Sequence, residues 1–362
     1  MHGMNRRDFL RCAGGLTMTT TLARVGSLSA WTNQPEMSKA GRTLVDKGFA
    51  SAQEIDKGIF AIVSDMSKGT QTVCNGGFIV GQTGTLVIES FASSAGAAFA
   101  VEAARMAAQV PFKAAVLTHY HFDHSFGTAH YGSQGIPVMS HPKARDLIQQ
   151  QYVALQGQDK TSILAGAAQK VAAARDAADR QHAESDLNAM KLMFGLIDNT
   201  VLALPNQPLR LESLPQRIDL GGVTVVLEAH PGHTPTDIVI RVPERNIAFA
   251  GDLLFQKLYP VCFDADMTAW RKVLDRFLSW GPSHRFVPGH GPVCGPEGVR
   301  AMAEILDHLR DHARISYDRK APLEEAQRTY SIPDKFKDWG MFAWGFSVGA
   351  AIEKYYGEFK KQ

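Results

Sequence analysis

The sequence predicts an α/β protein with mixed sheets. Short apolar runs of strand length alternate with Ala-rich or amphipathic stretches of helical length along the 362 residues. The composition is that of an ordinary globular protein, with 45% hydrophobic and 20% charged residues, which excludes a collagen-like or largely disordered chain. At roughly 150 residues per domain, this length fits two domains or one large domain with additions.

The expected strands fall into an early group and a late group. Residues 77–90 form an apolar–turn–apolar pattern that predicts two short strands around a glycine turn, and residues 94–109 are Ala-rich and predict a helix. Further strands are expected at residues 114–118, 138–139, 223–227, 238–242, 247–250 and 285–287.

Two long segments carry helical patterns instead. Residues 142–200 are dominated by Ala, Gln, Lys and Arg with almost no turn residues, so we expect two or three helices inserted between strands. We expect the apolar run 190–197 in this insert to pack on the core, and a role as a wall of the substrate site is the alternative. From Pro296 onward the chain again reads helical, and its aromatic residues at 339–356 are expected to serve core packing or a subunit contact.

The N-terminus has the features of an export signal. Arg6 and Arg7, followed by a polar residue and Phe-Leu, resemble the twin-arginine signal, and small residues at 27–30 suit cleavage. The mildly apolar stretch at 9–22 is too short for a membrane span of about 20 residues. We therefore expect residues 1–30 to be a signal peptide, the twin-arginine export machinery to be a partner, and the mature protein to be periplasmic without stable membrane insertion.

The charge balance argues against a polyanionic partner. The whole chain carries a formal charge of +2, and the first 30 residues hold four Arg and one Asp, so the remainder is close to −1. Such a protein has no global field to capture nucleic acid. We expect a small-molecule substrate, while the oligomeric state stays open.

The strongest chemical signal is the segment Thr118-His119-Tyr120-His121-Phe122-Asp123-His124, which directly follows an apolar strand. In extended chain, residues i and i+2 point the same way, so His119 and His121 project together with Asp123 nearby. Three imidazoles and a carboxylate within six residues suit one or two divalent metal ions.

Three later sites repeat one arrangement, in which an apolar strand ends and a ligand-type residue follows among small residues. They are His230-Pro231-Gly232-His233-Thr234-Pro235, Gly251-Asp252 and Pro288-Gly289-His290-Gly291-Pro292. Glycine and proline fix tight loops and let the backbone approach an ion closely. Together with the first motif they supply seven candidate ligands at strand ends, where open α/β sheets place their sites.

This set of motifs resembles the metallo-β-lactamase superfamily over about residues 76–292. The resemblance implies an αββα sandwich at 31–295, with a helical insert at about 142–200 and a C-terminal helical extension at 296–362. It implies that the first metal is held by His119, His121 and His233, the second by Asp123, His124 and His290, with Asp252 bridging. Glu89 stands where the family usually has Asp, at a position that supports the metal loop. The stretch from Asp264 to Pro292 and the C-terminal helices look like the periplasmic branch associated with quinoprotein relay systems.

The resemblance also implies the chemistry. We expect a hydrolase with two Zn²⁺ per chain, iron or manganese being alternatives, in which a metal-bridging hydroxide attacks an ester, thioester, lactone or β-lactam carbonyl. Asp123 and Asp252 are the expected catalytic residues: Asp123 orients the nucleophile and Asp252 fixes the separation of the ions. The alternatives are a mononuclear iron enzyme of sulfur or redox chemistry on the same fold, and a non-catalytic metal-binding relic.

The remaining candidates are assigned structural roles. Asp237 and Glu89 are candidates to accept hydrogen bonds from ligand imidazoles, and His230 is expected to be a loop residue. Structural or surface roles are expected for His130, His141, His182, His284, His308 and His312. Cys74, Cys262 and Cys294 are expected to be structural, with one disulfide at most.

Overall fold

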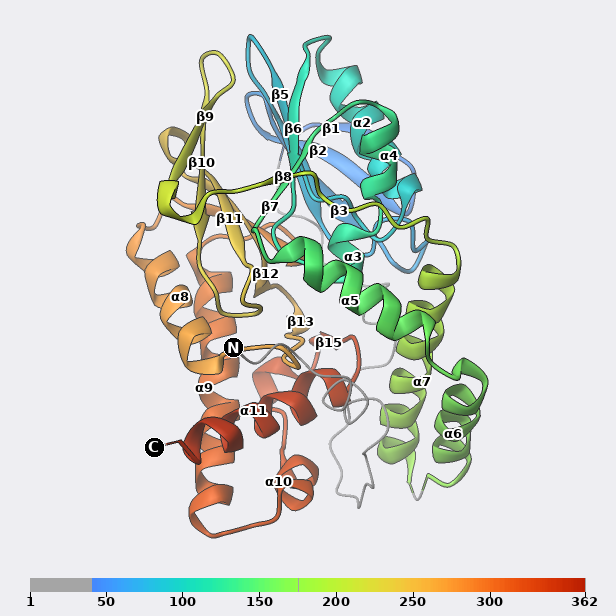
Figure 1. Ribbon diagram of the computed structural model, residues 1–362. Coiled ribbons are helices and arrows are strands. Elements are labelled where there is room, and N and C mark those ends of the chain that lie inside the picture. The colour runs from blue at the N-terminus through green and yellow to red at the C-terminus, as the bar shows by residue number, and fades with distance from the viewer. Residues whose placement is uncertain (1–40, 175, 362) are drawn as a thin grey trace.

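The computed structural model describes residues 41–174 and 176–361, so the predicted export signal lies outside the described residues. Two mixed β-sheets pack against each other, and helices cover the outer face of each sheet (Figure 1). The predicted αββα sandwich is confirmed. No helix within the described part of the chain has both the length and the apolar character needed to cross a membrane.

The first sheet has eight strands that lie in chain order. They are β1 (Thr43–Asp46), β2 (Ala50–Asp56), β3 (Ile59–Ser64), β4 (Gly76–Val80), β5 (Thr85–Ile88), β6 (Phe112–Val116), β7 (Val138–Ser140) and β8 (Gln207–Pro208). Neighbours from β1 to β5 are antiparallel and those from β5 to β8 are parallel. Parallel neighbours need crossover connections, which are supplied by α2 (Ser94–Ala107) and by the short helices α3 (Phe122–Ser125) and α4 (Thr128–Ser133).

The second sheet has the order β14-β12-β11-β10-β9. Its strands are β9 (Gln216–Asp219), β10 (Thr224–Ala229), β11 (Ile238–Val242), β12 (Ile247–Phe255) and β14 (Arg285–His290), and α8 (Met267–Ser279) crosses over between the parallel pair β12 and β14. Two short strands, β13 (Leu258–Tyr259) and β15 (Gly340–Met341), pair in parallel outside both sheets. Single 3-10 turns occur at Leu211–Ser213, Pro243–Arg245 and Asp334–Phe336.

Strand alternation divides the core into layers. In β11, Ile238 and Ile240 enter the core between the two sheets, whereas Val239 enters the core beneath the helices. In β3, Ile59 likewise faces the second sheet while Phe60 faces the helices on the first sheet. Both faces of each strand are therefore buried, which explains why these strands are nearly continuous apolar runs in the sequence.

The insert forms three helices, α5 (Ala144–Gln156), α6 (Lys160–Ala172) and α7 (Ala177–Asp198). Helices α5 and α7 pack on the helical face of the first sheet through residues such as Ile148 and Phe194. Helix α6 begins at Asp159, whose carboxylate accepts a hydrogen bond from the Ser162 backbone N–H at 3.0 Å. The predicted helical segment 142–200 is confirmed, and the structure fixes its number of helices at three.

The C-terminal region forms α9 (Pro296–Asp318), α10 (Leu323–Thr329), a π-helical turn (Gly345–Gly349) and α11 (Ala350–Phe359). Its hydrophobic residues share one core with α8 and the helical face of the second sheet, and that core contains Trp339, Trp344, Tyr355 and Tyr356. Core packing is confirmed for these four aromatic residues. Phe342 and Phe346 are partly exposed and have a different role, described below.

The strands of the two main sheets differ from the sequence expectation in two ways. Strands β1 to β3, β8 and β9 lie outside the ranges that the sequence predicts. Strand β12 does not end before Gly251-Asp252 but continues to Phe255, with a shift of register at Gly251. Asp252 is therefore held by a strand backbone on both sides.

Candidate metal centre

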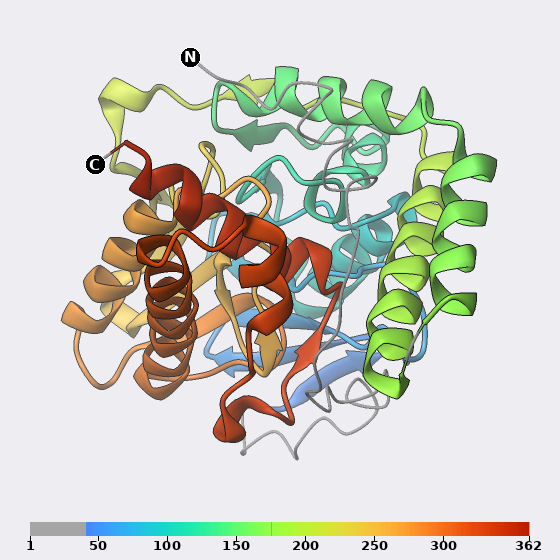
Figure 2. The ribbon, with the colours of Figure 1, turned by 90° about the horizontal axis from the view of Figure 1, so that it is seen from below.

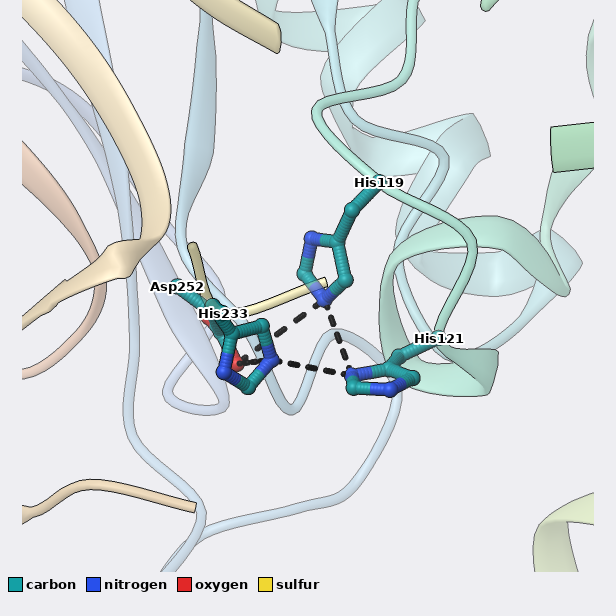
Figure 3. Close-up of side chains that lie close together, drawn as sticks. All are labelled: His119, His121, His233 and Asp252. Carbon is teal, nitrogen blue, oxygen red and sulfur yellow. Dashed lines mark hydrogen bonds and ion pairs between the residues drawn. The ribbon is translucent and has the colours of Figure 1, made fainter. Parts of the chain in front are cut away.

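Three imidazoles converge at one end of the sandwich. The chain leaves β6 in an extended segment that carries His119 and His121 and then turns into α3, while His233 lies on the loop between β10 and β11. His119 Nε2 lies 3.1 Å from His121 Nδ1, which in turn lies 3.0 Å from His233 Nε2. All three side chains are buried, and their ring nitrogens point into the same small space (Figure 3).

A second group of ligand-type atoms lies beside the first. His290 Nε2 is 3.2 Å from Asp123 Oδ2, and His124 Nε2 is 3.5 Å from the same oxygen. Asp252 faces both groups. Its Oδ2 is 3.5 Å from His233 Nε2, whereas its Oδ1 is 3.1 Å from His124 Nε2 and 3.4 Å from His290 Nε2. The structure thus brings all seven predicted ligands together and places Asp252 between the two groups.

The orphaned atoms of the centre test whether metal ions fit there. His124 Nε2 and Asp252 Oδ1 are buried without a hydrogen-bond partner, although they lie only 3.1 Å apart. In the first group, His121 Nδ1 lies at hydrogen-bond distance from both His119 Nε2 and His233 Nε2. Each neutral imidazole has only one N–H, so three facing nitrogens are poorly paired with one another. Buried polar atoms without partners are costly, and imidazole and carboxylate ligands suit zinc and related divalent ions. The donor set therefore fits one metal ion in each group.

Two glycines allow the strands to approach this closely. A Cβ built on Gly289 would lie 1.9 Å from Asp252 Oδ1, so β14 can pass the Asp252 carboxylate only with glycine at this position. Gly251 has a φ of +54°, and a Cβ there would lie 2.5 Å from the Thr118 hydroxyl. The separation of the two ligand groups is thus set by the backbones of β12 and β14.

Glu89 orients the His124 ring. It is 1% exposed at the end of β5, and its carboxylate accepts hydrogen bonds from His124 Nδ1 at 2.9 Å, from the Thr118 backbone N–H at 3.2 Å and from the Thr118 hydroxyl. The bond to Glu89 turns Nε2 toward the centre. Burial disfavours charge on His124, but Cys74 and the carboxylates of Asp252, Asp123 and Glu89 raise its pKa well above the usual value, so Nε2 releases a proton when a metal ion binds. The backbone of Glu89 has a φ of 74°, in a region that L-residues rarely adopt. The candidate role of Glu89 as acceptor of an imidazole N–H is confirmed.

Asp237 has a different role from the one considered for it. Its carboxylate accepts hydrogen bonds from the backbone N–H of Gly232 at 3.0 Å, from that of Thr234 at 2.8 Å and from the Thr234 hydroxyl at 2.7 Å. It therefore fixes the backbone on both sides of His233 instead of accepting from an imidazole. Burial raises the pKa of Asp237 to about 8, against the opposing effect of these hydrogen bonds.

Protonation differs between the two groups of the metal-free chain. Burial lowers the pKa of His233 to about 3, so its lone pair is free at neutral pH. Burial also disfavours charge on His290, but the carboxylates of Asp252 and Asp123 outweigh it and raise the pKa of His290 to about 9. His290 must therefore release a proton before it can bind a metal ion.

The other histidines lie outside the ligand groups, whereas one of the three cysteines, Cys74, contacts the metal loop. His230 Nε2 lies at hydrogen-bond distance, 2.8 Å, from the Glu228 carboxylate. In the part of the chain that the structure describes, the ligand groups include none of the other six histidines considered, which are His130, His141, His182, His284, His308 and His312. Cys74, Cys262 and Cys294 are buried free thiols, which agrees with the expected structural roles and with the limit of one disulfide at most. The Cys74 thiol donates to the Asp123 backbone carbonyl at 3.0 Å, a support for the metal loop that no sequence motif indicated.

An apolar pocket of about 760 Å³, its mouth included, opens beside the centre. Its floor consists of four predicted ligands, His121, Asp123, Asp252 and His290. The walls come from α5, α7, the segment 255–263 and the C-terminal segment 342–346. A concave, mostly apolar pocket with a few convergent polar groups is typical of a small-molecule site. Met193 lies in the run 190–197, for which a substrate wall is the alternative expectation. The sequence did not indicate Gln151, Leu155 or the segment 255–263, because these residues have no motif and meet only in the folded chain.

A buried histidine–carboxylate centre between two sheets, open to a pocket of this size, defines a metal-binding α/β-sandwich protein. Comparison with known proteins identifies the family: the model described as "Metallo-beta-lactamase superfamily" matches residues 69–161 and 164–294, more than half of the chain. The chain belongs to the metallo-β-lactamase superfamily.

Individual relatives match over shorter stretches. The chain is 33% identical over 117 residues to a type 2 metallo-beta-lactamase of Bacteroides fragilis, which covers 31% of this chain and 41% of that protein. It is 29% identical over 113 residues to an uncharacterized protein of Mycobacterium bovis, covering 29% of this chain and 50% of that protein. The chain thus spans half or less of the length of these curated relatives.

One solved structure supports the fold. A metallo-beta-lactamase from Pontibacter korlensis has 16% sequence identity and a TM-score of 0.50, over 71% of this chain and 99% of that chain. One from Erythrobacter litoralis has 18% identity and a TM-score of 0.49, over 73% and 98%. At these identities the likeness concerns the sandwich alone.

Proposed function

We propose that the protein is a dinuclear metal-dependent hydrolase that cleaves an ester, thioester, lactone or β-lactam. The observation that carries the proposal is the position of Asp252, whose two carboxylate oxygens face different ligand groups. A shared carboxylate is expected where two ions lie about 3.5–4 Å apart and act on one substrate. Membership of the superfamily and the seven-residue ligand set support the same chemistry.

Zinc is the metal we propose for both sites. His119, His121 and His233 would hold the first ion, Asp123, His124 and His290 the second, and Asp252 both. Such a pair of ions, when bound, supplies an activated water nucleophile at neutral pH and polarises the substrate carbonyl. Iron and manganese are the alternatives, since imidazole and carboxylate also suit them.

The residues of the chain supply orientation and exclusion of water. We assign Asp123 the role of accepting the hydrogen bond that orients the nucleophile, because its carboxylate lies on the pocket floor beside His290. The apolar walls limit water around the reacting carbonyl. No serine or cysteine nucleophile is needed, and Cys74 is fully buried with its pKa raised by burial.

An activity panel with metal analysis tests this function. Zinc-loaded protein is assayed with chromogenic esters, thioesters, lactones and cephalosporins, beside Asp252→Ala and a control, Asp275→Ala, at an exposed carboxylate on α8. We expect at least one class to be hydrolysed by the wild type and the control, and by Asp252→Ala at least 100-fold more slowly. A single iron per purified chain together with oxygen consumption would instead establish the redox alternative. Two bound ions without hydrolysis of any class would support the relic.

We also propose that the protein is exported to the periplasm by the twin-arginine route. The support is the motif around Arg6 and Arg7, which lies outside the described residues. Replacing both with Lys is expected to leave the precursor in the cytoplasm, measured by cell fractionation with a periplasmic marker. Unchanged periplasmic delivery would contradict the assignment. The branch associated with quinoprotein relay systems remains part of this proposal, supported by the sequence from Asp264 to Pro292.

A further inference from the structure

The pocket beside the metal centre has an almost wholly apolar wall. Aromatic side chains line the pocket from the floor outward. The ring centroid of Phe263 lies 5.0 Å from that of His121 and 5.7 Å from that of Phe346. Phe263, Phe342 and Phe346 are each partly exposed, although they are large apolar residues, because they face the pocket. No Lys or Arg lines the pocket among the described residues. A charged group far from the metal centre would therefore be desolvated there without a partner.

The wall is held in place by contacts between distant segments. The Asp186 carboxylate on α7 accepts a hydrogen bond from the Gly345 backbone N–H at 3.4 Å, and the His182 ring stacks on Trp344 with centroids 4.1 Å apart. These contacts join the insert to the π-helical turn that carries Phe346, and Figure 2 shows the two segments side by side. The pocket is thus formed before a ligand arrives, which lowers the entropic cost of binding.

Gln151 is the exception in this wall. Apart from the four predicted metal ligands, it is the only polar side chain among the described residues that line the pocket. It lies on the buried stripe of α5 with Ala144, Ile148 and Leu155, where an apolar residue is expected. The side chain is 5% exposed, and its Oε1 has no hydrogen-bond partner. A buried acceptor left unpaired is unfavourable unless a ligand pairs with it.

We propose that Gln151 is a specificity residue and that the substrate has an apolar body bearing one hydrogen-bond donor. This inference rests on the proposed hydrolase function. The carbonyl to be cleaved lies at the metal centre, and an aliphatic or aromatic body fills the wall lined by Phe263 and Phe346. A hydroxyl or amide N–H on that body donates to Gln151 Oε1. A site that pairs with a substrate donor rejects the analogue that lacks it far more strongly than an apolar site can.

Binding of product-like acids tests the assignment without relying on turnover. Unbranched fatty acids of four to eight carbons and the corresponding ω-hydroxy acids are titrated calorimetrically into zinc-loaded protein. We expect affinity to rise with chain length, and one ω-hydroxy acid to bind at least ten-fold more tightly than the plain acid of equal length. The length at which the hydroxyl helps measures the reach from the metal centre to Gln151.

Variants then locate the effect. Gln151→Leu is expected to abolish the hydroxyl preference, and the near-isosteric Gln151→Met to do the same should the leucine variant fold poorly. Gln150→Leu is the matched control, because Gln150 is the exposed neighbour on the same helix, and it should keep the preference. The proposal is overturned by a wild type without any hydroxyl preference, by a preference that persists in both Gln151 variants, or by affinity that does not depend on chain length. Binding as expected without hydrolysis of any substrate class would overturn the proposed function and leave the pocket assignment standing.

Discussion

Replacing Glu89 with Gln should weaken one metal site selectively. The substitution keeps the shape of the side chain but removes the charge that accepts from His124 Nδ1 at 2.9 Å and from the Thr118 backbone N–H at 3.2 Å. An amide oxygen placed toward His124 leaves the amide NH₂ facing the Thr118 N–H, so two donors oppose each other. In the opposite orientation, His124 Nδ1 must accept, the proton moves to Nε2 and the lone pair for the metal is lost.

The size of the effect follows from these bonds. A hydrogen bond to a charged group contributes about 1.5–3 kcal/mol, and 1.4 kcal/mol corresponds to a factor of ten in affinity. We therefore expect the dissociation constant of the second metal ion to rise by roughly 10- to 100-fold in Glu89→Gln, with the first ion little affected. The assay is competition for Zn²⁺ against a chromogenic chelator, fitted with two sites per chain.

The matched control is Glu228→Gln. Glu228 also accepts from an imidazole, His230 Nε2 at 2.8 Å, but this pair lies outside the ligand groups, so zinc affinity should stay unchanged. A Glu89→Gln protein that retains both affinities within about three-fold would refute the argument that Glu89 sets the His124 tautomer. Complete loss of the second ion would instead make Glu89 a direct ligand.

Three further predictions concern the centre and its walls. His290→Ala should reduce the metal content from about two ions toward one per chain, measured by elemental analysis, and two tightly held ions in the variant would show that the ligands are wrongly paired. Burial raises the pKa of Asp186 to about 6, so the charged form is disfavoured in the folded state and stability falls as pH rises from about 4 to 6. Asp186→Asn, which can still accept from Gly345, should flatten the dependence of Tm on pH over that range and raise Tm at pH 7; an unchanged slope would contradict this. Met193 lines the pocket, whereas Phe194 lies only in the core. Met193→Gln should therefore raise KM with both metals bound, and Phe194→Gln should lower Tm at unchanged KM. The reverse pattern would contradict the assignment of these walls.

The ligands could be predicted from the sequence because each lies in a short local pattern. His119, His121, Asp123 and His124 lie within six consecutive residues, and the other three lie among glycine and proline near strand ends. The roles of Glu89 and Asp237 could not be separated in this way, because both are lone carboxylates near a strand. Only the folded chain brings Glu89 to an imidazole ring and Asp237 to the backbone of a loop.

The pocket as a whole could not be predicted from the sequence, because its wall residues come from distant segments. Gln151, Phe263 and Phe346 are separated from one another by more than 80 residues, so their proximity depends on the packing of the insert and the C-terminal region against the sandwich. Gln151 follows two exposed glutamines in the sequence, and nothing in that run distinguishes the buried one. The sequence does indicate that β12 continues through Asp252, because Leu253, Leu254 and Phe255 prolong the apolar run.

The metal ligands and the pocket wall are positioned by different parts of the fold. The predicted metal ligands are positioned by strand backbones of the sandwich and by the loops at the strand ends. The pocket wall depends on two peripheral segments whose contacts include a hydrogen bond, a ring stack and apolar packing. Substitutions in those segments can reshape what the site accepts while the ions stay in place. Under the proposed function, selection could therefore change the substrate range through the insert and the C-terminal region without changing the metal ligands.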